Sequence, residues 1–536
     1  MTITNTVPPK NGHHRQSSNQ VFINHENIAF DEAGIKTKLL NLNQPCYIVQ
    51  VDDKIGFTNQ FQINEKIELL TALPPLTLQQ LGDRSFLEFH NVKYAYTAGA
   101  MAGGIASEEL VIACGKAGIL SSFGAGGLSS QRVESAIKQI QQALPNAPYA
   151  FNLLHSPSEP TIERGSVDLY LKYKVRTVEA SAFLDITPNI VYYRAAGLSL
   201  NDNNEIEINN RVIAKVSRRE VAAKFLAPPP EKMLAELVNQ GLITQLQADL
   251  AQQVPIADDI TVEADSGGHT DNRPLVCLLP SILELRDEMQ QKYGYSNPVR
   301  IGVAGGIATP QSALAAFMMG AAYVVTGSIN QSCVEAGTSE YTKTLLAQAQ
   351  MTDVIMAPAA DMFEMGVKLQ VLKRGTLFGM RSQKLYELYQ RYDSIEDIPV
   401  KEREKLEKQV FRQSLDSVWD STREYLSQRS PHKLERALKN PKFKMALIFR
   451  WYLGLSSRWS NSGETGRETD YQIWCGPAMG AFNNWVKDTY LAQPQNRHVV
   501  DIAQHIMTGA AYLYRLQTLK LQGIELPQHF AQYRIE

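Results

Sequence analysis

One acidic, glycine-rich segment ends in a histidine that could transfer protons. It reads Glu-Ala-Asp-Ser-Gly-Gly-His over residues 263–269 and follows an apolar run. Gly267 and Gly268 allow the backbone to approach a ligand closely, and an imidazole exchanges protons near neutral pH. A lone histidine is usually structural or solvated, but His269 alone among the ten in the chain has both a glycine approach and a strand end before it. His269 is therefore the candidate proton donor, with Asp265 or a water as the alternative.

Two glycine-containing turns could hold a phosphate group. Gly305 and Gly306 follow one apolar run, and Gly327 and Ser328 follow the next. Glycine is the residue that lets several backbone N–H groups crowd around an anion. The alternative is that these glycines only make tight turns between a strand and a helix. Two such turns at neighbouring strand ends favour the phosphate site.

Two polar side chains interrupt apolar runs. Lys215 lies within Val-Ile-Ala-Lys-Val-Ser, where its charge needs solvent, a partner or a bound anion. It could stabilise negative charge on a reduced cofactor, or it could simply extend to the surface. Asn152 could meet a phosphate or a cofactor edge, or satisfy a neighbouring backbone group. No second histidine or cysteine lies at ligand spacing from His269, so no metal site is predicted.

Eight short apolar runs supply the elements that would position these residues. They span residues 93–99, 118–124, 149–154, 177–183, 212–217, 260–265, 300–305 and 323–328. Eight strands that alternate with helices over about 240 residues predict an α/β fold, a (β/α)8 TIM barrel with its site at the carboxyl ends of the strands. An open doubly wound sheet is the alternative, but its G-x-G-x-x-G fingerprint does not follow a first strand here.

The sequence changes character on both sides of this barrel. We expect a flexible tail over residues 1–20, a small N-terminal β-containing subdomain over 21–85, the barrel over 86–345, and a helical lid and C-terminal region over 346–536. The last part is predicted to be helical because residues 361–460 are rich in Lys, Glu, Arg and Leu and contain few glycines.

Composition excludes several classes of protein. The 536 residues include 53 Lys plus Arg and 55 Asp plus Glu, and this balance argues against a dedicated nucleic-acid binder. The five cysteines are far apart and include no C-x-x-C pair, which excludes a disulfide framework and favours a reducing compartment.

The polar first 20 residues do not resemble a secretion signal. Residues 301–334 carry no charge, but frequent glycines indicate buried strands and a helix rather than a membrane span. A cytoplasmic protein is predicted.

Six segments, in this order, resemble the nitronate monooxygenase-like family of FMN barrels. They read AYTAGAMAGGIAS, SSFGAGGLSS, FNLLHSP, EADSGGH, GVAGGIATP and VTGSINQS. Two later stretches, at 357–378 and 471–483, resemble one branch of that family. It contains the stand-alone enoyl reductases that act with polyunsaturated fatty acid synthases and modular polyketide synthases. The resemblance extends from about residue 84 to the C-terminus.

The resemblance implies a cofactor, a reaction and a set of contacts. It implies FMN, NADPH as reductant, and hydride transfer to a trans-2-enoyl thioester on an acyl carrier protein. His269 matches the histidine near the flavin, and the implied flavin contacts are Gly99, Met101, Asn152, Lys215 and Gly267, with Gly305, Gly306, Gly327 and Ser328 at the phosphate. The rival functions are nitronate oxidation by FMN and oxygen, a non-redox phosphate-site barrel such as an aldolase or isomerase, and a non-catalytic synthase component. A homodimer is compatible with the resemblance.

A basic segment is the candidate docking surface for the carrier protein, since such partners are typically acidic. Residues 429–450 contain seven basic side chains and the single acid Glu435. The basic residues are Arg429, Lys433, Arg436, Lys439, Lys442, Lys444 and Arg450. The alternatives are an ordinary solvated surface and pairing with the acidic residues at 395–406.

Overall fold

The computed structural model describes residues 4–5, 27–60, 67–155 and 160–535. The tail predicted over residues 1–20 lies outside this part of the chain, except for Thr4–Asn5. These two residues form strand β1, which pairs antiparallel with β18 (Ile524–Glu525). Their backbone groups thus have hydrogen-bonding partners in β18.

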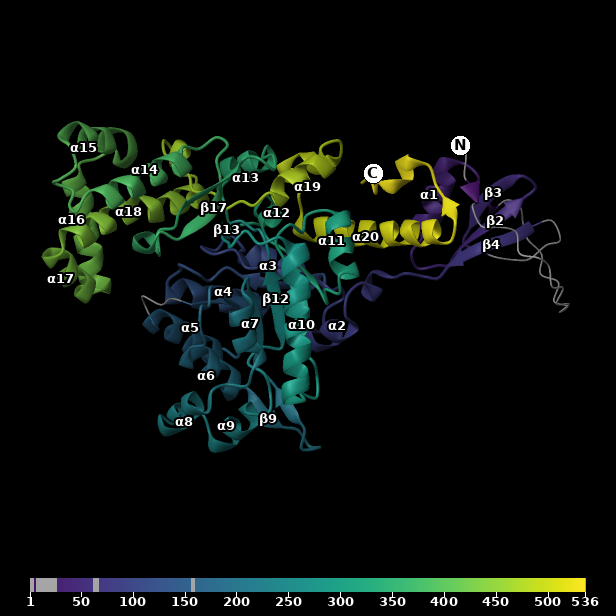
Figure 1. Ribbon diagram of the computed structural model, residues 1–536, viewed down its shortest axis with the longest axis horizontal. Coiled ribbons are helices and arrows are strands. Elements are labelled where there is room, and N and C mark those ends of the chain that lie inside the picture. Colours follow the sequence, from purple (N-terminus) through teal and green to yellow (C-terminus); the bar gives the residue numbers. More distant parts are fainter. Residues whose placement is uncertain (1–3, 6–26, 61–66, 156–159, 536) are drawn as a thin grey trace.

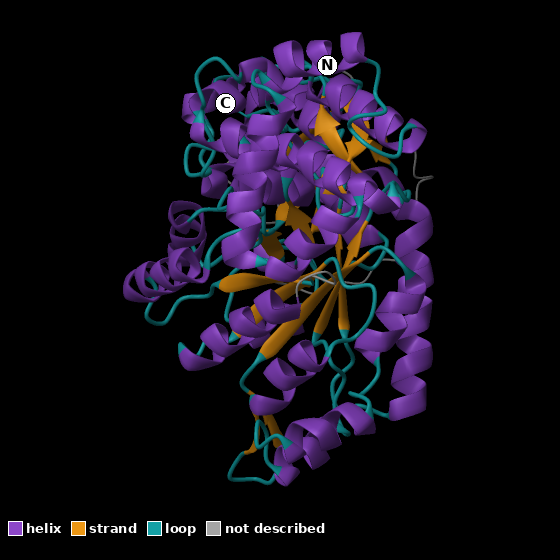
Figure 2. Ribbon diagram, turned by 90° about the vertical axis from the view of Figure 1, so that its left-hand side faces the viewer, coloured by secondary structure: helices purple, strands orange, loops and turns teal. Residues whose placement is uncertain are grey.

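Eight parallel strands close into a barrel at the centre of the molecule (Figures 1 and 2). In chain order they are β5 (Tyr96–Ala98), β6 (Leu120–Phe123), β7 (Ala150–Leu154), β8 (Thr177–Ser181), β11 (Arg211–Val216), β12 (Asp259–Glu263), β14 (Arg300–Ala304) and β15 (Val324–Thr326). Each strand pairs with its neighbours in this order, and β15 pairs with β5. Each predicted run overlaps one strand, so the (β/α)8 barrel is confirmed.

Helices surround the strands (Figure 2). Those around the barrel are α3 (Glu108–Lys116), α4 (Ser130–Ala143), α5 (Pro160–Lys172), α6 (Pro188–Ala196), α7 (Arg219–Leu226), α10 (Leu275–Tyr293), α11 (Pro310–Met318) and the short α12 (Ser328–Gln331). Ser107, Ser129 and Thr309 begin three of them, and each side-chain oxygen accepts a hydrogen bond from the backbone N–H three residues later. Helices α8 (Glu231–Asn239) and α9 (Gln245–Ala251) lie at the end of the barrel opposite β13 (Figure 1).

Helix α2 (Arg84–His90) closes the amino-terminal end of the barrel. The ring of Phe86 stacks on Tyr323 with 4.2 Å between centroids. The buried Asp259 accepts hydrogen bonds from Arg300 at 2.6 Å and contacts His90 Nε2 at 2.7 Å. Burial raises the pKa of Asp259, but Arg300 and His90 outweigh burial and bring it down to about 2. This end is therefore held by packing and by ion pairs.

The part before the barrel is a three-stranded antiparallel sheet. Strands β2 (Cys46–Val51), β3 (Lys54–Thr58) and β4 (Ile67–Leu73) pair in the order β3-β2-β4, and α1 (Glu32–Leu40) packs against them. The long helix α20 (Val499–Leu521) runs from the side of the barrel to this sheet (Figure 1). Its buried Arg515 donates to the backbone carbonyls of Leu39, Asn41, Leu42, Gln44 and Pro74.

The region after residue 346 is mainly helical, as predicted, and has a hydrophobic core of its own. The helices around that core are α14 (Phe378–Arg391), α15 (Val400–Leu406), α16 (Leu415–Arg429), α17 (Pro431–Lys439) and α18 (Pro441–Ser462). Besides β18, the region contains two longer strands that its helical composition does not predict. Strands β16 (Val354–Pro358) and β17 (Lys368–Leu372) pair with each other, and β17 pairs with β13 (Gly268–His269). The predicted proton donor therefore lies on a sheet shared with the region after residue 346.

No helix within the described residues combines the length and apolarity that a bilayer crossing requires. The uncharged run at 301–334 forms β14, α11, β15 and α12 of the barrel. Its low charge thus reflects burial within the α/β layers, as predicted.

Candidate functional site at the carboxyl end of the barrel

His269 comes after barrel strand β12 and is the second residue of β13. It pairs with Leu369 of β17. Its Nε2 lies 3.1 Å from Oδ1 of Asp361, and 43% of its side chain is exposed. Burial lowers the pKa of His269, but the hydrogen bond and charge of Asp361, together with the charge of Glu263, outweigh burial and raise it. Contact with His269 likewise holds the pKa of Asp361 below its usual range, although burial opposes this. The pair thus favours an imidazolium beside a carboxylate.

The loop before His269 is held by a glutamine of strand β17. Gln370 Nε2 donates to Oδ1 of Asp265 at 2.8 Å and to the carbonyl of Ser266 at 2.7 Å. Asn272 also donates to Asp265 Oδ1, at 2.9 Å. Because Asp265 is engaged in fixing the loop, it is a weaker candidate proton donor than His269.

Gly267 is required by close packing of two backbones. A Cβ at this position would lie 2.9 Å from backbone atoms of Cys475 and Gly476. Real Cβ atoms do not approach so closely, so a larger residue would push residues 475–476 away. The second family-specific stretch, at 471–483, therefore packs directly on the loop that carries His269.

Lys215 projects from β11 to a carboxylate rather than to solvent. Its Nζ lies 3.1 Å from Glu263 Oε1, which also accepts from Ser266 Oγ at 3.0 Å. Burial lowers the pKa of Lys215, but the charges of Glu263 and Glu179 outweigh it and raise the pKa. The sequence left solvent, a partner or a bound anion as alternatives for the charge of Lys215. The structure contains a partner, the carboxylate of Glu263.

Glu179 of β8 is a buried carboxylate beside Asn152. Its Oε2 accepts a hydrogen bond from the Ala100 N–H at 3.2 Å, and its side chain is almost completely enclosed. Its Oε1 has no hydrogen-bond partner within the described part of the chain. Asn152 Nδ2 donates to the Glu179 carbonyl at 3.0 Å and to Ser181 Oγ at 3.1 Å. Asn152 thus satisfies neighbouring groups, one of the two roles considered for it.

The loop after β5 carries Gly99 and Met101. The Gly99 N–H donates to the Thr326 carbonyl at 2.9 Å, which joins the ends of β5 and β15. The Met101 carbonyl accepts from the Ala106 N–H at 3.1 Å, so the loop folds back on itself. A Cβ at Gly124 would lie 1.7 Å from the Met101 oxygen, so glycine is required there for the loop to cross β6.

The two glycine turns lie on neighbouring strands, since β14 pairs with β15. Gly305 and Gly306 have φ of +84° and +77°, a conformation that favours glycine. A Cβ on Gly305 would lie 2.7 Å from the Ala264 carbonyl carbon, whereas Cβ atoms on Gly306 and Gly327 would meet nothing within 4 Å. Ser328 Oγ accepts from the Gly476 N–H at 3.1 Å. Open space therefore remains next to the backbone of these turns.

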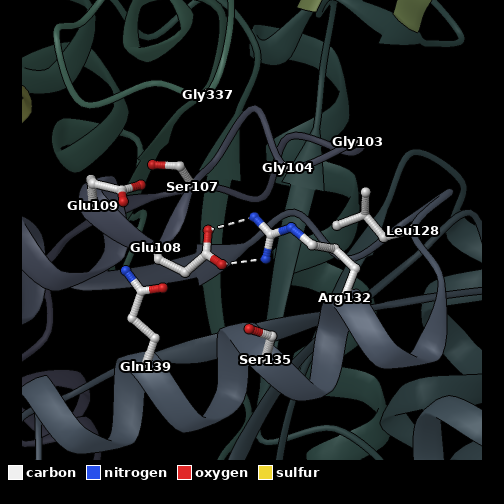
Figure 3. A pocket seen from close by; sticks show the side chains of 10 residues that line it. All are labelled: Gly103, Gly104, Ser107, Glu108, Glu109, Leu128, Arg132, Ser135, Gln139 and Gly337. Carbon is white, nitrogen blue, oxygen red and sulfur yellow. Dashed lines mark hydrogen bonds and ion pairs between the residues drawn. The ribbon is translucent and has the colours of Figure 1, made fainter. Parts of the chain in front are cut away.

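A pocket of about 350 Å³ lies beside the loop after β5, between α3 and α4 (Figure 3). Gly103, Gly104 and Gly337 line one side of it. Arg132 crosses the pocket and donates to both carboxylate oxygens of Glu108, one of them at 2.9 Å (Figure 3). Because Arg132 is already paired, the residues that line the pocket offer no free cation to an anionic ligand.

The structure brings all ten predicted residues to one end of the barrel. Eight of them follow strands β5, β12, β14 and β15, whereas Asn152 lies within β7 and Lys215 within β11. Sequence reasoning missed the roles of Glu179, Glu263, Asp361 and Gln370. Glu179 carries the same signal as Lys215, a charge within an apolar run. Asp361 and Gln370 have no local signal, because they are 92 and 105 residues from their partners.

Three family models match the chain. A model described as nitronate monooxygenase matches residues 84–386, and one described as the N-terminal domain of fatty acid synthase subunit PfaD matches residues 24–75. The third, the inserted helical domain of acyl-carrier-protein S-malonyltransferase, matches residues 392–471.

Similar proteins belong to synthase systems. A polyunsaturated fatty acid synthase subunit of Thraustochytrium sp. is 50% identical over 497 residues, 91% of this chain and 33% of that protein. Polyketide biosynthesis protein PksE of Bacillus subtilis is 47% identical over 85% of this chain and 58% of its own length. The chain thus spans between a third and three fifths of these two relatives.

One solved structure is similar over its whole length. It is the enoyl reductase domain of MlnA, from the macrolactin biosynthesis cluster of Bacillus amyloliquefaciens. It has 41% sequence identity and a TM-score of 0.79, and the match covers 83% of this chain and 100% of that domain. The chain therefore belongs to the nitronate monooxygenase family. Within that family it lies in the branch that contains the MlnA enoyl reductase domain, as the sequence motifs predict.

Proposed function

We propose that the chain is an FMN-dependent enoyl reductase that serves a polyunsaturated fatty acid or polyketide synthase. The observation that carries this proposal is the match to an enoyl reductase domain over the full length of that domain. The similarity to a polyunsaturated fatty acid synthase component and to a polyketide biosynthesis protein supports the same system. His269, at the glycine-rich end of the barrel, is consistent with the reaction.

The site fits FMN on two observations. Open space adjoins the backbone of Gly306 and Gly327, where a phosphate would accept N–H hydrogen bonds together with Gly305 and Ser328. A buried oxygen of Glu179 lacks a partner among the described residues and could accept from a ring N–H. The remaining proposed ring contacts are Gly99, Met101, Asn152, Lys215 and Gly267.

Bound FMN, reduced by NADPH, would supply hydride to the β-carbon of a trans-2-enoyl thioester. The chain would then provide a proton at the α-carbon and hydrogen bonds to the thioester oxygen. As an imidazolium, His269 donates Nε2–H to Asp361, and its Nδ1–H remains for the substrate. Backbone N–H groups of the glycine loops are the candidates for the oxygen.

Nitronate oxidation by oxygen is the second candidate, because the matching family model carries that description. A catalytically silent synthase component is the candidate outside catalysis. Spectroscopy of the FMN-loaded protein under anaerobic conditions separates them. We expect NADPH to bleach the flavin and an enoyl thioester, but not a nitroalkane, to restore its colour. Bleaching of oxidised FMN by a nitronate but not by NADPH, with oxygen restoring the colour, would favour the second candidate, and bleaching by neither donor would favour the third.

The proposed partner is an acyl carrier protein, and the candidate docking surface on this chain is the basic segment at 429–450. Some of its basic side chains are engaged by neighbouring groups and are therefore poor candidates for docking. Lys442 donates to the carbonyls of Tyr389 and Tyr392 at the end of α14, Lys444 pairs with Glu396 at 3.6 Å, and Arg450 pairs with Glu364 at 3.2 Å. All three cations are engaged by neighbouring groups after residue 346, but only Lys444 pairs within 395–406, the alternative considered from the sequence. Arg436 and Lys439, both exposed on α17, are the better candidates for docking.

A further inference from the structure

Glu179 places a buried negative charge at the inner side of the loop after β5. Only 3% of the residue is exposed, and Oε2 is fixed by the Ala100 N–H at 3.2 Å. A Cβ at Gly99 would lie 4.0 Å from the same oxygen, so the carboxylate lies directly against this loop. Its second oxygen, Oε1, has no hydrogen-bond partner in the described chain. A buried carboxylate oxygen that accepts no hydrogen bond costs free energy. This cost indicates that a donor from a bound ligand satisfies the oxygen.

The cation next to Glu179 does not cancel this charge. Lys215 is the cation whose positive form Glu179 stabilises, but Lys215 Nζ is bound to Glu263 Oε1 at 3.1 Å. The three side chains, Glu179, Lys215 and Glu263, together carry two negative charges and one positive charge. Both carboxylates are largely withdrawn from solvent, so water and salt screen them weakly. As ionised groups they sum to one negative charge, which would act on a ring bound at this end of the barrel.

We propose that Glu179 accepts a hydrogen bond from the bound FMN ring through Oε1, and that the net negative charge of Glu179, Lys215 and Glu263 lowers the reduction potential of the cofactor. This inference rests on the proposed function, since it requires FMN at this end of the barrel. Two-electron reduction adds electron density to the ring, and a fixed negative charge nearby disfavours the reduced form. A lower potential makes the reduced cofactor a stronger hydride donor, which suits reduction of an enoyl thioester.

The wild-type protein gives the first test. By linkage, a protein that lowers the potential binds oxidised FMN more tightly than reduced FMN. We expect a preference of about tenfold or more, which for a two-electron couple is a potential about 30 mV below that of free FMN. A potential equal to or above that of free FMN would mean that Lys215 dominates, and the proposal would be wrong.

Glu179→Gln gives the second test, because it removes the charge and keeps an acceptor oxygen. The variant should retain FMN, and its equilibrium constant for reduction against a reference dye should rise about tenfold, about 30 mV. The matched control is Glu108→Gln, another buried carboxylate, which is paired with Arg132 on the outer side of the loop (Figure 3). The control should leave the potential unchanged.

The outcomes separate this inference from the proposed function. A variant that retains FMN at the wild-type potential, or a control that shifts the potential equally, overturns the role of Glu179 alone. A protein that binds no FMN overturns the proposed function and this inference with it. If Glu179→Gln does not fold, the wild-type comparison with free FMN still tests whether the site as a whole lowers the potential, as the proposal requires.

Discussion

Asp361 should control the pH at which the proposed reductase loses activity. His269 must be protonated to donate, and Asp361 raises its pKa against the effect of burial. Asp361→Asn keeps the shape of the side chain and removes its charge. A group whose pKa is raised in this way is protonated at low pH and loses its proton as pH rises, so removing Asp361 should move this loss to lower pH. Activity should therefore fall at alkaline pH and stay unchanged at acidic pH.

The exposure of the pair limits the size of this effect. The side chains of His269 and Asp361 are 43% and 55% exposed, so solvent screens the interaction strongly. Exposed ion pairs are worth about 0.2–1 kcal/mol, and 1 kcal/mol is a factor of about five in the ratio of imidazolium to imidazole. Above the pKa, kcat should therefore fall by up to about fivefold.

The assay is kcat for a small soluble enoyl thioester between about pH 5.5 and 9, with FMN saturating. Asp168→Asn is the control, because Asp168 forms an exposed ion pair with Arg164 on α5 that lies outside the site. Its profile should match that of the parent. An unchanged alkaline limb, or an equal loss at every pH, would show that Asp361 does not act through the protonation of His269.

Three further perturbations test other parts of the site. His269→Ala should retain FMN and its reduction by NADPH, but its rate of enoyl reduction should fall about 10²-fold or more. Unchanged turnover would mean that Asp265 or a water is the proton donor instead. Gly327→Val places a branched side chain in the open space at the phosphate turn, so the variant should purify folded but colourless, whereas Gly454→Val, in helix α18 with equal room for a Cβ, should stay yellow. Arg436→Glu combined with Lys439→Glu should lower kcat/KM for a carrier-bound substrate about tenfold at low salt and leave a small thioester within about twofold, and an equal loss on both substrates would indicate a structural role.

The barrel could be predicted because its information is local. Each strand is a short apolar run that ends in a turn, and the order of such runs defines the topology. The N-caps Ser107, Ser129 and Thr309 are visible in the sequence for the same reason. The sheet of β13, β16 and β17 was not predicted, since β13 has two residues and pairs with a strand about 100 residues later.

The candidate site likewise contains some residues that the sequence could predict and some that it could not. The glycine turns and His269 follow strand ends, and a barrel gathers strand ends at one place. Asp361 and Gln370 come from the unpredicted sheet, so no spacing in the sequence connects them to His269. The roles of Lys442 and Lys444 depend on where α14 ends and on the position of Glu396, and both follow from tertiary packing rather than from a count of charges.

The contacts of Arg515 define what a transplantable unit would be. Helix α20 begins against the barrel and ends at the N-terminal sheet, where Arg515 satisfies five backbone carbonyls between residues 39 and 74. Removing either segment would leave buried polar groups of the other without partners. Similar sequences lie within longer synthase proteins, so an engineer who moves the proposed reductase between synthases must transfer residues 39–74 and 499–521 together, although more than 400 residues separate them.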